Sequence, residues 1–125
     1  MEGYQCNFKD GKDIDDALNF AAKSLNPYAD KNWPVPKSLK KKQILNLIKD
    51  FKNTAKRAKE IGFECLEIHM AHGYLLHQFI SPISNKRKDK FGGSTANRAL
   101  FPLMIAKEIR KLWPKNKILG ARITA

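Results

Sequence analysis

The sequence is poor in several features that define specialised classes of protein. It has two cysteines, Cys6 and Cys65, without a C-x-x-C spacing, which excludes a disulfide framework, and we expect both thiols to be reduced. No apolar run approaches the roughly 18 residues of a membrane span. The acidic first 16 residues lack the basic start and apolar stretch of a secretory signal. We therefore expect a cytoplasmic protein with no membrane partner.

Acidic residues are also scarce, because 12 Asp and Glu face 24 Lys and Arg and leave a net charge of +12. Such an excess can indicate nucleic-acid binding. The charge is mostly lysine scattered along the chain, where it also serves solubility, so we favour solubility over a nucleic-acid partner. The 125 residues suffice for one domain at most. An eight-stranded α/β barrel, typically ~250 residues, is excluded for a single copy of the chain.

The spacing of apolar residues divides the chain into two parts. Residues 1–37 show weak periodicity, and we expect mostly irregular structure there, with a short helix near Asp15–Lys23. From Ser38 to Ala58 apolar residues recur at spacings of three and four, which predicts a helix with one buried face. Ser38 is the expected N-cap of this helix and Gly62 its stop.

Two short strands and a second long helix are predicted after Gly62. Phe63–His69 is short and bounded by turn signals, as is typical of a strand. Ser94 is expected to cap the second helix, which should kink at Pro102 and end at Trp113-Pro114. Ile118–Thr124 is expected to be the second strand. Strands that alternate with long amphipathic helices predict a parallel sheet, so the fold class is α/β.

Side chains alternate across a strand, so the strand residues can be assigned to faces. Leu66 and Ile68 share one face of the first strand and are expected to pack against the helices. Glu67 and His69 lie on the opposite face, together with Arg122 of the second strand. Charged residues are costly on a covered face unless they are paired or functional. From these residues alone, a structural Glu67–Arg122 ion pair with a hydrogen-bonded histidine is slightly favoured over a functional site.

The residues after the first strand shift this balance toward function. His69 lies at the C-terminal end of its strand, where α/β proteins bind ligands, and His72 and Tyr74 follow at once. Imidazoles can donate hydrogen bonds to a carbonyl or nitro oxygen, and a phenol can deliver a proton to a carbanion-like carbon. A metal site at the H-x-x-H pair ranks well below this role, because no third ligand makes a recognised spacing.

Motifs in a fixed order connect the sequence with a known family. They are H-x-x-H-G-Y from His69, S-N-x-R-x-D-x-[YF]-G-G-S over residues 84–94, and N-R shortly afterwards. On these motifs, residues 32–125 resemble the Old Yellow Enzyme family of NADH:flavin oxidoreductases, especially its branch with paired substrate histidines. Residues 1–31 match poorly. The resemblance implies a partial (β/α)8 TIM barrel, with about two consecutive β-α units of it.

Enzymes of this family contain FMN, take hydride from NADH or NADPH, and pass it to an electron-poor alkene or a related acceptor. By position, the resemblance implies that His69 and His72 bind the carbonyl or nitro oxygen of a small-molecule acceptor. Tyr74 would supply the proton, and Arg122 would lie against the pyrimidine edge of the flavin. Residues 38–125 would then form the central β/α portion of the oxidoreductase barrel.

Departures from the family pattern raise further expectations. Met70 replaces the small residue usual between the histidines, and we expect it to reshape the pocket. The loop over residues 85–94 is expected to be architectural, with Arg87 paired to an acid rather than to a phosphate. Only two of the barrel's eight strands and none of its phosphate-binding loops can be placed, so FMN should bind weakly to this chain alone.

Other interpretations of the sequence stay open. The chain could be a catalytically inactive remnant of such an enzyme. It could instead be half of a split enzyme, completed by a complementary chain or by a second copy. A third alternative is a basic module that binds an anionic partner such as nucleic acid on the same scaffold.

Overall fold

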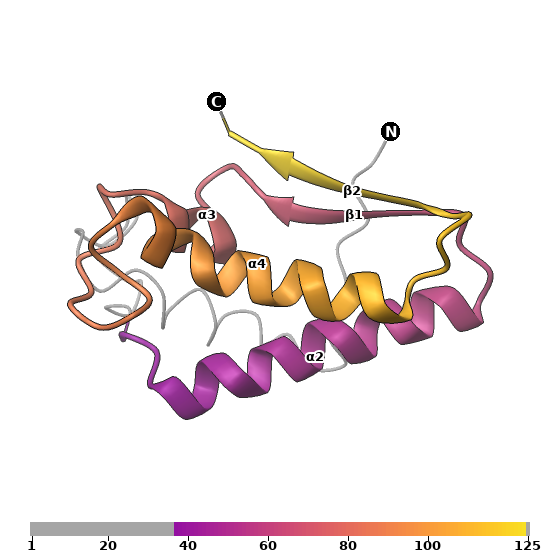
Figure 1. Ribbon diagram of the computed structural model, residues 1–125, viewed down its shortest axis with the longest axis horizontal. Coiled ribbons are helices and arrows are strands. Elements are labelled where there is room, and N and C mark those ends of the chain that lie inside the picture. The colour runs from indigo at the N-terminus through magenta and orange to yellow at the C-terminus, as the bar shows by residue number, and fades with distance from the viewer. Residues whose placement is uncertain (1–36, 125) are drawn as a thin grey trace, which may run out of the picture.

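The computed structural model describes residues 37–124, which form a parallel two-stranded sheet packed against helices (Figure 1). The elements are, in chain order, α2 (Lys41–Glu60), β1 (Cys65–Met70), α3 (Leu75–Ile80), α4 (Thr95–Leu112) and β2 (Ile118–Ile123). The predicted order of long helices and strands and the parallel sheet are confirmed. The short helix expected near Asp15–Lys23 lies outside the described residues. Within residues 37–124, no helix is long and apolar enough to cross a membrane.

The start of α2 differs from the sequence prediction. Lys40 is the N-cap, and its backbone N–H donates to Oε1 of Gln43 at 2.8 Å. The hydroxyl of Ser38 does not cap the helix. It accepts a hydrogen bond from Nη1 of Arg87 at 3.1 Å. The prediction of Ser38 as the cap is therefore wrong, because a tertiary contact 49 residues away uses the hydroxyl.

The end of α2 is set by Gly62, as predicted. Gly62 has a φ of 92°, in the left-handed region that glycine adopts at little cost. Its N–H donates to the carbonyl of Lys59, and the N–H of Phe63 donates to the carbonyl of Ala58. These two bonds satisfy carbonyls of the last helical turn and lead the chain directly into β1.

Ser94 caps α4, as predicted, because its hydroxyl accepts a hydrogen bond from the backbone N–H of Asn97 at 3.2 Å. The helix continues through the buried Pro102, and the kink expected there stays a prediction. It ends at Trp113, whose indole Nε1 donates to the carbonyl of Ile118 at 3.0 Å. This bond ties the end of α4 to the first residue of β2.

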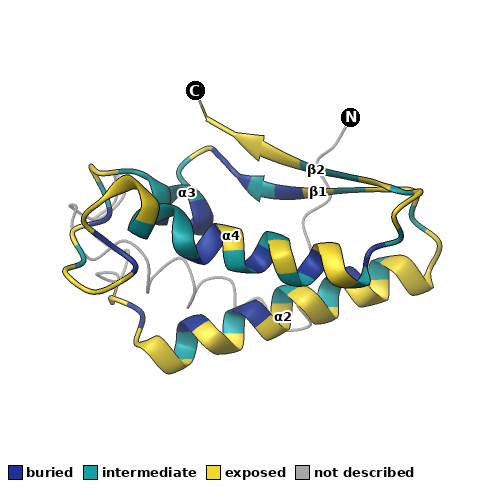
Figure 2. Cartoon of the chain, viewed as in Figure 1, coloured by how far each residue is buried: buried dark blue, intermediate teal, exposed yellow. Residues whose placement is uncertain are grey.

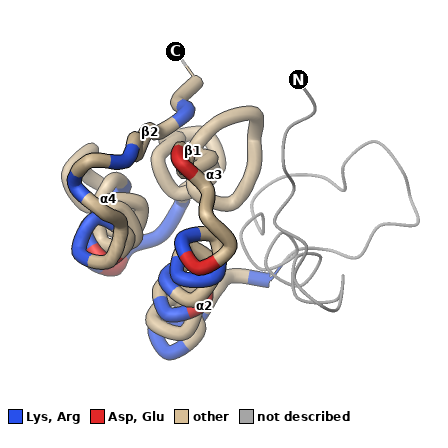
Figure 3. The backbone as a smooth tube through the Cα atoms, turned by 90° about the vertical axis from the view of Figure 1, so that its right-hand side faces the viewer, with Lys and Arg blue, Asp and Glu red and all other residues tan. Residues whose placement is uncertain are grey.

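The two long helices lie side by side on one side of the sheet, and the core fills the space between them and β1 (Figures 1 and 3). Ile68 and Met70 of β1 point into this core, whereas Glu67 is exposed, so the predicted alternation is confirmed. The two long helices contribute six further core side chains: Ile44, Ile48 and Ala55 from α2 and Phe101, Ile105 and Ile109 from α4. The opposite face of the sheet is largely exposed (Figure 2).

Met70 is 6% exposed and packs in the core with Ile68. The expectation that Met70 reshapes the pocket is therefore wrong. Strand alternation turns its side chain away from the face that carries His69. Met70 therefore packs against the helices, and His69 lies on the opposite face of the sheet.

The short helix α3 is not among the elements predicted from the sequence. Leu75, Leu76 and Phe79 anchor the six-residue helix in the core, and Phe79 packs on Phe101 with ring centroids 4.7 Å apart. A helix of six residues is too short to produce a recognisable hydrophobic period. Tertiary packing therefore forms this element.

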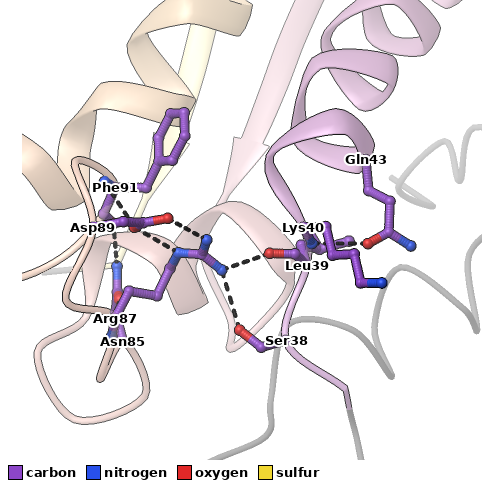
Figure 4. Close-up of polar contacts among 8 residues, drawn as sticks. All are labelled: Ser38, Leu39, Lys40, Gln43, Asn85, Arg87, Asp89 and Phe91. Carbon is purple, nitrogen blue, oxygen red and sulfur yellow. Dashed lines mark hydrogen bonds and ion pairs between the residues drawn. The ribbon is translucent and has the colours of Figure 1, made fainter.

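Arg87 fastens the loop between α3 and α4 to the start of α2 (Figure 4). Its Nε and Nη2 donate to the carboxylate of Asp89 at 3.0 and 2.5 Å. Its Nη1 donates to the carbonyl of Leu39 at 2.8 Å and to the hydroxyl of Ser38. Asp89 has a lowered pKa, chiefly because its side chain accepts hydrogen bonds from Arg87. The guanidinium is occupied by the protein itself, so its role is architectural, as predicted.

Asn85 organises the same loop from inside. It is buried, and its Nδ2 donates to the carbonyls of Phe79 and Phe91 at 2.6 and 2.8 Å. Its Oδ1 accepts the backbone N–H of Arg87 at 3.1 Å. One amide side chain therefore satisfies three backbone groups of a segment that has no regular hydrogen-bond ladder.

Candidate functional site

His69, His72 and Tyr74 come together at the C-terminal end of β1. The ring centroid of His69 lies 5.0 Å from that of His72 and 5.2 Å from that of Tyr74, and both ring pairs are tilted. His69 thus lies next to both other rings. The side chain of Tyr74 is 48% exposed and His72 is exposed, so the cluster opens to solvent. The structure brings together the three residues that the sequence assigns to the acceptor.

Arg122 lies beside this cluster, because β1 and β2 pair His69 with Arg122 in register. Its Nε donates to Oε1 of Glu67 at 2.7 Å, so the ion pair expected from strand parity is confirmed. The two side chains are 55% and 47% exposed. A pair this exposed contributes only about 0–1 kcal/mol to stability. The bond also leaves both Nη atoms of Arg122 without a hydrogen-bond partner among the described residues.

The turn between β1 and α3 has an unusual backbone conformation that several side chains hold. His72 has a φ of 58° and Gly73 a φ of 78°. The N–H of His72 donates to Oγ1 of Thr124 at 2.9 Å. The N–H of Gly73 donates to Nδ1 of His77 at 2.8 Å, and its carbonyl accepts from Nε2 of Gln78. A left-handed conformation costs a non-glycine residue about 1–2 kcal/mol, so these bonds offset a real penalty.

Sequence reasoning missed Thr124 and His77 as supports of the site. The Gly73 that follows His72 does signal a turn. No residue close to His72 in the sequence indicates that its partner lies 52 residues later in the chain, after α4 and β2. The distance between these two residues in the chain therefore explains why only the folded structure reveals the contact.

Burial lowers the pKa of His69, and the neighbouring His72 and Arg122 lower it further, whereas Glu67 opposes the shift. The neutral imidazole is therefore the favoured form of His69 near neutral pH. A neutral imidazole donates through one ring N–H. His69 can thus act as a hydrogen-bond donor to an oxygen without carrying a full positive charge.

The residues around the histidine pair do not form a metal centre. Among the described residues, no group of three His, Cys, Asp or Glu side chains is arranged to hold a metal ion. His77 directs its Nδ1 to the Gly73 amide. The Nδ1 atom of His77 is therefore engaged by the turn between β1 and α3.

The face of the sheet beside the cluster carries a glycine and an exposed cation. Gly120 pairs with Glu67 in register, and a Cβ at Gly120 would meet no atom within 4 Å. Arg122 presents its two Nη groups on this same open face. An exposed guanidinium on a flat surface suits the edge of a planar heterocycle that carries negative charge. The site thus combines a cation, two imidazoles and a phenol on one side of the sheet.

Known proteins are similar to this chain in sequence. The model of the NADH:flavin oxidoreductase / NADH oxidase family matches residues 4–125. An NADPH dehydrogenase from Clostridium acetobutylicum is 48% identical over 96 residues, which cover 77% of this chain and 28% of that protein. An NADH:flavin oxidoreductase from Gibberella zeae is 49% identical over 92 residues, which cover 74% of this chain and 22% of that protein.

Solved structures extend the comparison to three dimensions. Morphinone reductase, a TIM-barrel enzyme, superposes with a TM-score of 0.69 at 33% identity, over 73% of this chain and 24% of its own. The same enzyme has been solved in complex with tetrahydroNAD, with the same TM-score and identity. The α/β unit therefore corresponds to part of a TIM barrel, as predicted.

The extent of these matches adds two findings. The family match begins at residue 4, so it extends further toward the N-terminus than the resemblance expected from residue 32 onward. The chain spans about a quarter of the length of the relatives and structures that it matches.

Proposed function

The chain belongs to the NADH:flavin oxidoreductase / NADH oxidase family, and on this basis we propose that it forms the acceptor-binding part of an FMN-dependent oxidoreductase. The reductant would be NADH or NADPH, and the acceptor a small electron-poor alkene, a conjugated carbonyl or a nitro compound. The observation that carries the proposal is the cluster of His69, His72 and Tyr74 beside Arg122 at the C-terminal end of the strands. Ligands of α/β proteins bind at this end.

Arg122 is the residue that would hold the flavin. When bound, FMN supplies the hydride chemistry that links a nicotinamide to an organic acceptor. The guanidinium of Arg122 is exposed and always charged, and Glu67 orients it through Nε alone. Its two Nη groups remain available to donate to the pyrimidine edge of the ring. The positive charge would stabilise negative charge on that edge.

His69 and His72 would bind the oxygen of the acceptor. Their ring centroids are 5.0 Å apart and their planes are inclined by 52°, a geometry in which one N–H from each ring can approach a shared oxygen. Donors placed in advance stabilise negative charge as it develops on that oxygen. The lowered pKa of His69 keeps its imidazole neutral, so the ring orients and polarises the acceptor as a donor.

Tyr74 would supply the proton that completes reduction of an alkene. Its ring lies 5.2 Å from that of His69, so the phenol stands next to the acceptor bound by the pair. It is nearly half exposed, which leaves its hydroxyl able to recover a proton from solvent. A positioned acid of this kind contributes about 10²–10⁴-fold to the rate.

The proposal is tested in a hybrid enzyme, in which the matched segment of the C. acetobutylicum NADPH dehydrogenase is replaced by the corresponding residues of this chain. We expect the hybrid to hold FMN and to oxidise NADPH with 2-cyclohexen-1-one, a simple electron-poor alkene. Replacing both histidines, His69→Ala and His72→Ala, should lower kcat/KM for this enone by about 10²–10³-fold, the range for loss of an oxyanion donor.

The control replaces an exposed pair on α2 in the same way, with Lys56→Ala and Glu60→Ala, and should leave kcat/KM unchanged. The proposal is contradicted if the histidine variant holds FMN, is reduced by NADPH and turns over the enone like the unaltered hybrid. Tyr74→Phe adds a second criterion. It should slow reduction of the enone and leave reoxidation of the reduced flavin by dioxygen unchanged, because that reaction needs no proton on carbon.

A further inference from the structure

His72 has a left-handed backbone conformation, which costs a non-glycine residue about 1–2 kcal/mol. Its φ of 58° lies in the left-handed region, and it is the only non-glycine residue of the described part of the chain with a positive φ. In this region the Cβ atom crowds the backbone carbonyl. The imidazole of His72 therefore reaches the cluster only while something outside the residue keeps its backbone in place.

The hydroxyl of Thr124 makes the contact that can do this. Oγ1 of Thr124 accepts the N–H of His72 at 2.9 Å. The parallel ladder ends at the pair of Met70 and Ile123, and Thr124 is the next residue along. Beyond the ladder the two strands separate, so a side chain replaces the backbone as the partner of the His72 amide. Thr124 is exposed and contributes nothing to the core.

The following peptide is held from the opposite side. The Gly73 N–H donates to Nδ1 of His77, and the Gly73 carbonyl accepts from Nε2 of Gln78, so α3 fixes Gly73. Thr124 is different because it follows β2, the strand that carries Arg122. The bond to Thr124 therefore fixes the histidine turn relative to the strand on which the flavin-facing cation lies.

We propose that Thr124 is a positioning residue, which holds the His72 amide and thereby keeps the imidazole of His72 within 5.0 Å of that of His69. Without this bond the His72 backbone relaxes out of the left-handed region. The relaxation turns the Cα–Cβ bond and separates the two rings. The consequence for acceptor binding rests on the proposed function, whereas the geometric role of Thr124 does not.

The geometric role is tested by NMR on the full 125-residue chain, labelled with ¹³C and ¹⁵N. Thr124→Val and Thr124→Ala both remove the hydroxyl from an exposed position, and Thr124→Ser keeps it. We expect the cross-relaxation between the His69 and His72 ring protons to disappear in the first two variants. The His72 amide should also exchange about tenfold faster. The serine variant should restore both signals.

Thr54→Val is the matched control. Oγ1 of Thr54 also accepts a hydrogen bond, from Arg57 within α2, so the same change removes a similar bond away from the site. It should leave both signals as they are. The proposal is overturned if the Thr124→Val and Thr124→Ala chains keep the ring contact and the slow amide exchange, or if Thr124→Ser behaves like them.

A kinetic measurement in the hybrid enzyme separates this inference from the proposed function. Thr124→Val should lower kcat/KM for 2-cyclohexen-1-one about tenfold through a higher KM, and Thr124→Ser should restore it. Rings that separate together with this loss support both proposals. Rings that separate while the kinetics stay unchanged support the positioning role and contradict the acceptor-binding role of the histidine pair.

Discussion

At the scale of single residues, the charges around His69 determine the pKa of its imidazole. Burial, His72 and Arg122 lower the pKa of His69, and Glu67 raises it. The unfolded chain, with a histidine pKa of about 6.5, therefore binds a proton at a higher pH than the folded chain does. Above the pKa of the unfolded chain, neutral His69 does not reduce the stability of the fold. As the pH falls from that pKa through the lower pKa of the folded chain, the fold loses stability.

The opposing effects of the two charged neighbours can be separated by substitution. Glu67→Gln should lower the pKa of His69 further, because it removes the charge that favours the imidazolium. Arg122→Gln should raise that pKa, because it removes a repelling cation. Both changes are measured from the chemical shift of the His69 ring proton against pH, with Lys56→Gln on α2 as the control. An opposite sign in either variant would contradict the assigned causes.

The residues to which we assign the chemistry could be singled out from the sequence, whereas the residues that support them could not. Strand alternation places His69 and Arg122 on one face, and the motif adds His72 and Tyr74 from positions next in the chain. Thr124 and His77 escape such reasoning, because their contacts depend on the left-handed turn and on where β2 ends.

Among the helices and strands, the spacing of apolar residues and the position of glycine predict those elements that local sequence determines. The long helices and both strands follow from spacing, and Gly62 ends α2 as expected. Ser38 and α3 differ, since a distant guanidinium takes the Ser38 hydroxyl and core packing forms α3. Tertiary contacts thus override local preference in the short segments of the chain.

The glycine pair in the loop before α4 offers a test at this scale. A Cβ at Gly92 would lie 2.3 Å from the carbonyl oxygen of Arg87, so Gly92→Ala must displace the backbone of the loop. Gly93 has a φ of 80° and nothing within 4 Å of its Cβ position, so Gly93→Ala should cost only the conformational penalty of about 1–2 kcal/mol.

We therefore expect Gly92→Ala to lower the free energy of unfolding more than Gly93→Ala does. Urea denaturation of the two variants and the unaltered chain measures the difference. A larger loss in Gly93→Ala would show that the close approach to Arg87 does not constrain the loop.

At the scale of the whole molecule, the described unit has two different sides. One face of the sheet is covered by α2 and α4, while the other carries the site and remains open (Figures 1 and 2). Lys and Arg residues are spread along both long helices (Figure 3). The charge of +12 therefore says less about function than the few polar residues on the open face do. The family assignment follows from the sequence matches.

In the proposed function, His69 and His72 donate hydrogen bonds to the oxygen of the acceptor. Isotope-edited infrared spectroscopy measures this directly, with ¹³C-carbonyl 2-cyclohexen-1-one bound to the oxidised hybrid enzyme. Two donors polarise the carbonyl, so we expect its stretching frequency to be lower in the hybrid than in the His69→Ala and His72→Ala double variant. The same frequency in both proteins, with FMN and enone bound in each, would contradict the claim.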